Sequence, residues 1–167
     1  AVVDRGHRSS RPMRRIHPAG LYEAICPLEA FASSPARDPH NNSRPQPAYE
    51  LRVADREGEM KTVQDPYSFA PLLTDFDLHL FGEGKLLRGY EKLGAQVREI
   101  DGVRGVNFAV WAPNARSISV VGDFNHWDGQ QHRMQPRGRS GVWETFVPHI
   151  GPGTLYTAIS RLVEQKL

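Results

Sequence analysis

The segment NHWDG (residues 125–129) places a large aromatic side chain in a short polar loop. The tryptophan of this loop, Trp127, either folds back onto the chain or presents its flat face to solvent. An outward face suits the apolar C–H face of a glucose ring, while nearby polar groups bind the sugar hydroxyls. Trp127 is therefore a candidate ligand-binding residue. Asn125 is a weaker candidate, because its side chain could equally shape the turn.

The other two tryptophans favour structural roles. Trp111 alternates with apolar residues in GVNFAVWAP (105–113), and Trp143 lies in the middle of GVWETFVP (141–148). An aromatic residue within an alternating strand more often packs into the core than it binds a ligand.

The acidic and histidine residues show no pattern typical of catalysis or metal binding. Asp123 and Asp128 flank a turn, where carboxylates accept local backbone hydrogen bonds. Glycoside cleavage needs two carboxylates held about 5–5.5 Å apart around a sugar cleft. Among the seven histidines only His126 and His132 form a loosely spaced pair, and Cys26 is the single cysteine. We expect no catalytic residue, no metal site and no cofactor.

Length and charge restrict the partners. The 167 residues allow one domain or two small ones, fewer than the roughly 200 residues of an eight-fold barrel. The formal net charge is +2, and the basic excess lies near the N-terminus without aromatic residues or a recognition helix. No run approaches 18 apolar residues, and no charged-then-apolar leader begins the chain. We therefore expect an intracellular chain with no nucleic-acid or membrane partner.

The elements that position these residues are mostly strands. The residues VREI (97–100) and GVNFAVWAP (105–113) flank the turn pair Asp101-Gly102 and predict a hairpin. Further strands are predicted at residues 117–124, 141–148 and 155–160. Several short strands separated by turns indicate an all-β sandwich rather than a parallel sheet.

Helical signals are confined to one segment between the strands. Thr74 or Asp75 can cap a short helix that Gly82 ends, and a second short helix is predicted over residues 85–93. By contrast, residues 31–47 are dense in Pro, Ser and Asn and predict an exposed loop.

An internal repeat divides the chain into two β units. GLYEAICP (20–27) and GVWETFVP (141–148) share Gly, Glu and Pro, and Met13 and Met134 lie seven residues before them. Two flanking matches follow the same order: VVD (2–4) with VVGD (120–123), and AYELRV (48–53) with LYTAIS (155–160). Such an ordered set indicates two copies of one supersecondary unit.

The comparison of the copies also predicts that each lacks outer strands. The second copy has leading strands (105–119) that the first lacks, and the first continues into a turn and strand (54–69) that the second lacks. The chain begins with Ala1 rather than Met. We therefore expect a window cut through two tandem modules, as in a fragment or processed chain.

The stretch FAVWAPNARSISVVGDFNHWDG (108–129) closely resembles the N-terminal, non-catalytic region of bacterial 1,4-α-glucan branching enzymes. In that family a carbohydrate-binding module of family 48 precedes a family 13 glycoside-hydrolase barrel. Residues 65–95 are similar to the segment that joins this module to an earlier sandwich domain, and HPAGLYEAICP (17–27) is similar to that domain. The family usually has LYKY or LYKF where this chain has LYTAIS, so Thr157 stands in place of a lysine.

The resemblance implies two tandem immunoglobulin-like β-sandwich modules joined by a short helical connector. The expected parts are a disordered leader (1–12), a partial N-terminal sandwich (13–73), the connector (74–95), a C-terminally truncated family 48 module (96–160) and a tail (161–167). In related modules the tryptophan of this FNxW loop stacks on α-glucan. The resemblance therefore implies glucan binding by Trp127, with Asn125 as its companion.

The expected function is that of the N-terminal part of a glycogen branching enzyme. The chain would bind or position α-1,4-glucan, or glycogen, for a catalytic barrel that it does not contain. The parent reaction, by resemblance, cleaves an α-1,4-glucan and transfers it to a 6-hydroxyl, and this chain alone is expected to be inactive. Two alternatives stay open: a free-standing glucan-binding or regulatory module, and a protein-interaction sandwich in which Trp127 does not respond to sugars.

Overall fold

The computed structural model describes residues 2–4, 10–27, 49–54, 57–100 and 102–162. The described chain divides into two compact units, one ending at Ala70 and one beginning at Pro71. The exposed loop predicted at residues 31–47 lies outside the described residues. No described helix is long and apolar enough to cross a membrane.

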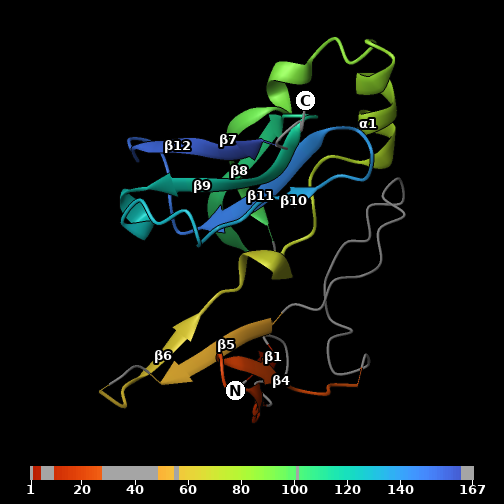
Figure 1. The fold of residues 1–167 in the computed structure, drawn as a ribbon. Coiled ribbons are helices and arrows are strands. Elements are labelled where there is room, and N and C mark those ends of the chain that lie inside the picture. The colour runs from red at the N-terminus through yellow and green to blue at the C-terminus, as the bar shows by residue number, and fades with distance from the viewer. Residues whose placement is uncertain (1, 5–9, 28–48, 55–56, 101, 163–167) are drawn as a thin grey trace. The chain divides into compact units, whose positions relative to one another are not determined.

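The second unit is a β-sandwich of two antiparallel sheets (Figure 1). The larger sheet has the order β10 (Gln135–Pro136), β11 (Val142–Pro148), β8 (Val103–Trp111) and β7 (Gly94–Ile100), and the smaller sheet pairs β9 (Ala115–Gly122) with β12 (Tyr156–Leu162). Alternate residues of these strands point between the sheets. Six of the side chains there form the buried core: Val106, Phe108, Ile118, Val120, Met134 and Val147. The predicted all-β sandwich is confirmed.

The hairpin predicted around Asp101-Gly102 is also confirmed. Strands β7 and β8 pair from Gly94 opposite Ala109 to Ile100 opposite Val103, which leaves a two-residue turn. Gly102 has a φ of 75°, in the left-handed region that such turns require. Asp101 itself lies outside the described residues.

Residues 71–93 pack on the outer face of the larger sheet. Leu73 is buried against Ala109 and Val142, and Leu78 and Phe81 of helix α1 (Asp75–Gly82) pack on this cluster. The helix begins as predicted at Thr74, where a capping box forms. The Thr74 hydroxyl accepts a hydrogen bond from the backbone N–H of Asp77, and the Asp77 carboxylate accepts one from the backbone N–H of Thr74.

The second predicted helix, over residues 85–93, is wrong for most of its length. Only a 3-10 turn, η3 (Gly89–Glu91), forms there. Gly84 and Gly94 bound the segment with left-handed φ values of 69° and 82°. The segment between them is too short to offset the cost of helix nucleation, and the glycine inside it lowers the helix propensity further.

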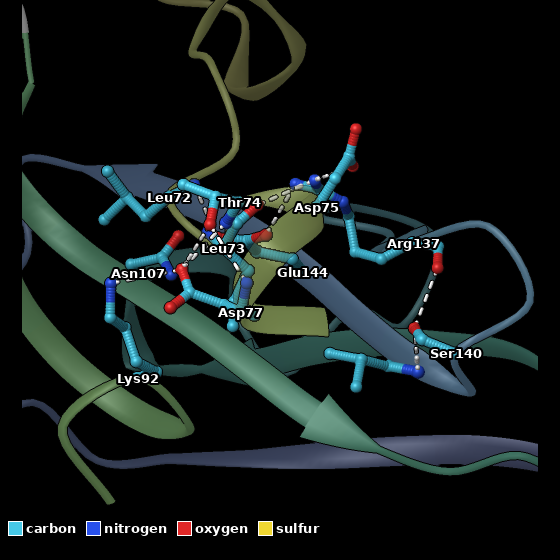
Figure 2. Close-up of polar contacts among 11 residues, drawn as sticks. Leu72, Leu73, Thr74, Asp75, Asp77, Lys92, Asn107, Arg137, Ser140 and Glu144 are labelled. Carbon is cyan, nitrogen blue, oxygen red and sulfur yellow. Dashed lines mark hydrogen bonds and ion pairs between the residues drawn. The ribbon is translucent and has the colours of Figure 1, made fainter. Parts of the chain in front are cut away.

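A buried carboxylate, that of Glu144 on β11, fastens residues 72–73 to the sheet (Figure 2). Glu144 Oε1 accepts hydrogen bonds from the backbone N–H groups of Leu72 (2.7 Å) and Leu73 (3.1 Å) and from Asn107 Nδ2 (3.0 Å). Its Oε2 accepts from Arg137 Nη1 at 2.9 Å, and Arg137 Nη2 donates to Leu73 O at 2.7 Å. The Glu144 and Arg137 side chains are only 2% and 10% exposed. The segment before α1 is therefore held by a buried ion pair.

The first unit contains a four-stranded antiparallel sheet and a separate hairpin. The sheet has the order β2 (Ser10–Arg11), β1 (Val2–Asp4), β5 (Tyr49–Ala54) and β6 (Met60–Val63); the hairpin joins β3 (Arg14–His17) to β4 (Leu21–Glu23), and a 3-10 turn, η2 (Pro66–Ser68), follows the sheet. At residues 2–4 and 10–11 the structure thus differs from the predicted disordered leader. These residues are ordered by pairing, since β1 lies between β2 and β5. Residues 1 and 5–9 lie outside the described residues.

The two copies of the predicted repeat share their strand register. In the first copy Val2 and Val3 lie opposite Leu51 and Glu50, and in the second Val120 and Val121 lie opposite Ala158 and Thr157. In the hairpins Arg14 pairs with Glu23 and Arg15 with Tyr22, as Gln135 pairs with Glu144 and Pro136 with Trp143. The repeat is therefore confirmed at the level of individual residue pairs.

Each copy carries a strand that the other lacks in the described part of the chain. Strand β11 pairs with β8, whereas its first-copy equivalent, β4, pairs only with β3. Conversely, β5 pairs with β6, whereas its second-copy equivalent, β12, pairs only with β9. Strand β12 extends to Leu162, so the predicted tail (161–167) begins within a strand. Residues 163–167 lie outside the described residues.

Candidate functional site

The loop that carries Trp127 begins directly after β9 with the 3-10 turn η4 (Asp123–Asn125). His126 and Trp127 follow with left-handed φ values of 52° and 60°. This conformation costs about 1–2 kcal/mol for each non-glycine residue, so neighbouring contacts must hold it. Two backbone hydrogen bonds of 3.0 Å do so, from Trp127 N–H to Gly122 O and from Asp128 N–H to Asn125 O.

The Trp127 side chain is half exposed, with 50% of its surface open to solvent. Its indole Nε1–H donates to Asp123 Oδ1 at 3.2 Å, which anchors one edge of the ring. Of the two orientations that the sequence allows, the structure has the exposed one. A ring that is already held loses little rotational freedom when a ligand stacks on it.

Asn125 is placed differently from Trp127. It is only 2% exposed. Its Oδ1 accepts a hydrogen bond from Gly122 N–H, and its Nδ2 donates to Val120 O, both at 2.9 Å. The structure therefore gives Asn125 the turn-shaping role that the sequence left as an alternative, and does not present its amide to a ligand.

His132 lies against the inner side of this loop. Its Nδ1 is 3.1 Å from Asn125 Nδ2, and its ring meets the ring of Phe124 nearly perpendicularly, with centroids 5.2 Å apart. Burial lowers the pKa of His132 below its ordinary value of 6.5. The sequence suggested no role for His132 beyond a loose pairing with His126. Its contact with Asn125 depends on how the loop folds over β9, which residue spacing does not reveal.

The far end of the loop packs against the smaller sheet. A Cβ atom at Gly129 would lie 2.8 Å from Ile159 Cδ1 on β12, so a side chain there has no space unless Ile159 moves. The loop therefore meets the smaller sheet at both ends, where it leaves β9 and where Gly129 contacts Ile159 of β12.

The two carboxylates of the loop support its shape. Asp123 holds the indole of Trp127. Asp128 accepts hydrogen bonds from Gln130 N–H and Gln131 Nε2, and these bonds lower the pKa of its carboxyl group. Within the described ranges, no group of three or more His, Cys, Asp or Glu side chains could hold a metal ion.

The two tryptophans that were predicted to be structural differ in their burial. Trp143 packs against the sandwich core as predicted, and its Nε1–H donates to Ala112 O at 3.1 Å. The prediction for Trp111 is wrong, because its side chain is 57% exposed. Trp111 is the last residue of β8 and lies on the outer face, where its ring makes an edge contact with Phe81 (centroids 6.1 Å apart) and its Nε1 lies close to Gly141.

Comparison with known protein families identifies the sandwich that carries the loop. Residues 92–161 match carbohydrate-binding module 48, the isoamylase N-terminal domain. The match includes β8, β9, the Trp127 loop and nearly all of β12.

Comparison with curated proteins extends the similarity to most of the chain. The chain is 44% identical over 155 residues to the 1,4-alpha-glucan branching enzyme GlgB of Rhodopirellula baltica, covering 93% of this chain and 19% of that protein. For the enzyme of the same name from Rubrobacter xylanophilus the identity is 52% with the same coverages, and for that of Synechocystis it is 47% over 86% of this chain and 17% of the relative.

The chain spans about a fifth of the length of these relatives, and the similarity lies in their N-terminal region. The chain is thus similar over most of its length to the N-terminal region of the 1,4-alpha-glucan branching enzymes, and its residues 92–161 match carbohydrate-binding module 48.

Proposed function

We propose that the chain binds α-1,4-glucan through Trp127, as the N-terminal part of a branching enzyme of glycogen biosynthesis. The module would hold or position a glucan chain for a family 13 catalytic barrel outside this chain. The class of ligand is supported by the match to a carbohydrate-binding module, and the enzyme context by relatives that are branching enzymes. A role in glycogen synthesis would place the chain in the cytoplasm.

One observation carries this proposal. Trp127 is half exposed on a loop whose backbone and indole ring are both hydrogen bonded in place. The flat ring can stack on the apolar face of a glucose unit. Exposed amides of Gln130 and Gln131 lie on the same loop and can bind sugar hydroxyls. Asn125 contributes by fixing the turn beneath the ring.

Native affinity electrophoresis in gels containing glycogen tests the proposal. We expect the parent chain to be retarded and Trp127→Ala to lose most of the retardation. A stacked aromatic ring contributes about 0.5–1.5 kcal/mol beyond the area that it buries, which corresponds to a several-fold change in affinity.

Trp111→Ala is the matched control, because Trp111 is exposed to a similar extent on β8. It should be retarded like the parent. Equal retardation of Trp127→Ala and the parent, with both folded by circular dichroism, would remove Trp127 from the site. No retardation of the parent itself would favour the protein-interaction sandwich instead.

A further inference from the structure

We propose that His132 is a positioning residue that holds the Trp127 loop in its binding geometry through Asn125, so that acid releases the loop and weakens glucan binding while the sandwich stays folded. The inference rests on the glucan-binding function proposed above, and adds to it a regulation of the same site by pH.

The orientation of the Asn125 amide is fixed by two backbone groups. Gly122 N–H can only donate, so the atom 2.9 Å away must be the amide oxygen. Val120 O can only accept, so the atom 2.9 Å away must be the amide nitrogen. A flipped amide would lose both bonds. Asn125 therefore turns its N–H₂ group toward His132.

This orientation determines the protonation state of His132. Its Nδ1, 3.1 Å from Asn125 Nδ2, must present a lone pair, because the amide nitrogen is a donor. The ring is then neutral, with its proton on Nε2. A doubly protonated ring would place one N–H group against another, and the contact would become repulsive.

The surroundings of His132 also favour the neutral ring. Its ring packs on Phe124, and burial lowers its pKa below 6.5. The ionisable residues on the loop, on β12 and beside His132 are Asp123, His126, Asp128, Arg133, Tyr156 and Arg161, and β9 contributes none between Ser117 and Gly122. Asp123 and Asp128 are bonded within the loop, and no carboxylate of the described residues forms an ion pair with His132. No negative charge therefore compensates a proton on the ring.

The sign of the pH effect follows. Because the pKa of His132 is lowered, its hydrogen bond to Asn125 is complete above pH 6.5 and is lost as the pH falls through the lowered value. Asn125 then loses the shorter of the two contacts that its Nδ2 makes with the loop and keeps only the 3.5 Å approach to Asp128 O. Trp127, whose left-handed backbone depends on that turn, is released with it.

Two measurements on the full chain between pH 7.5 and 5.0 test the inference. The first follows the indole N–H signals by NMR without sugar. We expect the Trp127 signal to move with a midpoint below pH 6.5 and the Trp143 signal, in the core, to stay in place. The second is glycogen affinity, which should fall about fivefold to tenfold over the same range, as expected for the loss of one hydrogen bond at a buried donor.

Two histidine variants provide the matched pair. His132→Asn keeps an acceptor for Asn125 that does not titrate, and asparagine tolerates the φ of 46° found there. It should abolish both transitions. His126→Asn makes the same change at the exposed histidine of the loop, which has a φ of 52°, and should leave both transitions unchanged.

Several outcomes would overturn the inference. These are a Trp127 transition that persists in His132→Asn, one that disappears in His126→Asn, or one that coincides with loss of the Trp143 signal through global unfolding. If the parent does not bind glycogen at any pH, the proposed function fails. In that case the NMR titration, which needs no sugar, still tests whether protonation of His132 changes the conformation of the loop.

Discussion

At the level of single residues, the amide of Asn125 determines how the loop is held. We expect Asn125→Ala to lower the free energy of unfolding by about 2–3 kcal/mol, because it leaves Gly122 N–H and Val120 O without their partner in a buried place. Urea denaturation measures this. Asp128→Asn is the control, because its carboxylate bonds only to Gln130 and Gln131 within the loop and should change stability less than Asn125→Ala. Equal stabilities of Asn125→Ala and the parent would contradict the buried role.

Sequence reasoning selected Trp127 as the candidate ring and left turn shaping as an alternative for Asn125, but it gave His132 no role. Trp127 could be predicted because an aromatic residue in a polar loop is unusual on its own. The role of Asn125 depends on Val120 O, Gly122 N–H and His132, atoms that meet only when the loop folds back over β9. Trp111 was predicted to be buried from the alternation of its strand. Alternation shows on which face of a sheet a residue lies, but not whether another element covers that face, and Trp111 is exposed.

At the level of elements, Glu144 joins the helix-bearing segment to the sheet. We expect Glu144→Gln to destabilise the second unit by about 3 kcal/mol, because the buried Arg137 would lose its close carboxylate and keep only the exposed Asp75, at 3.9 Å, as an ionic partner. Urea denaturation, with α1 followed by hydrogen exchange, measures the loss.

The repeat supplies the control for this prediction. Glu23 occupies the equivalent position of the first copy, but its side chain is 46% exposed and forms an ion pair with the exposed Arg14 at 3.3 Å. Glu23→Gln should therefore cost at most about 1 kcal/mol. If both variants lost the same free energy of unfolding, burial of Glu144 would not contribute to stability.

Strand β12, which among the described strands pairs only with β9, gives a second prediction at this level. In the first copy β6 covers the equivalent edge of β5, with Val63 opposite Leu51. Replacing residues 163–167 by a copy of residues 56–63 would offer β12 the same strand, since Leu162 already occupies the position equivalent to residue 55. We expect a higher melting temperature and less aggregation, because an unpaired edge templates association with other chains. Denaturation with light scattering compares the two chains. If the original chain is monomeric and unfolds in a sharp transition that the extension does not change, β12 does not need a partner strand equivalent to β6.

The elements themselves were largely predictable. Alternation and the Asp101-Gly102 turn indicated the strands of the second unit, since both act locally. The helix over 85–93 was overestimated because its apolar spacing suits a helix, while the flanking glycines leave too little chain to nucleate one.

For the whole molecule, the two copies share a scaffold but not the binding loop. The strand registers agree residue by residue, which explains why a repeat with few identities was detectable in the sequence. Between the matching strand and the matching methionine, however, the second copy has FNHWDGQQHR (124–133) where the first has RGHRSSRP (5–12). The first copy has no aromatic residue there. We therefore assign the proposed glucan contact to the second unit alone.

The same view of the whole chain predicts that it neither branches nor hydrolyses glucan by itself. Glycosidic bond cleavage requires a carboxylic acid and a second carboxylate on opposite sides of a bound sugar, about 5–10 Å apart. Of two described clefts of the second unit, one of about 200 Å³ is lined by Phe108 and Tyr156 without any carboxylate, and one of about 190 Å³ has a single carboxylate, Glu91. Neither can supply that pair. Incubation of amylose with the purified chain, followed by iodine absorbance and assay of α-1,6 linkages, should match a mock preparation. Linkage formation above that background would show that the chain contains a catalytic centre.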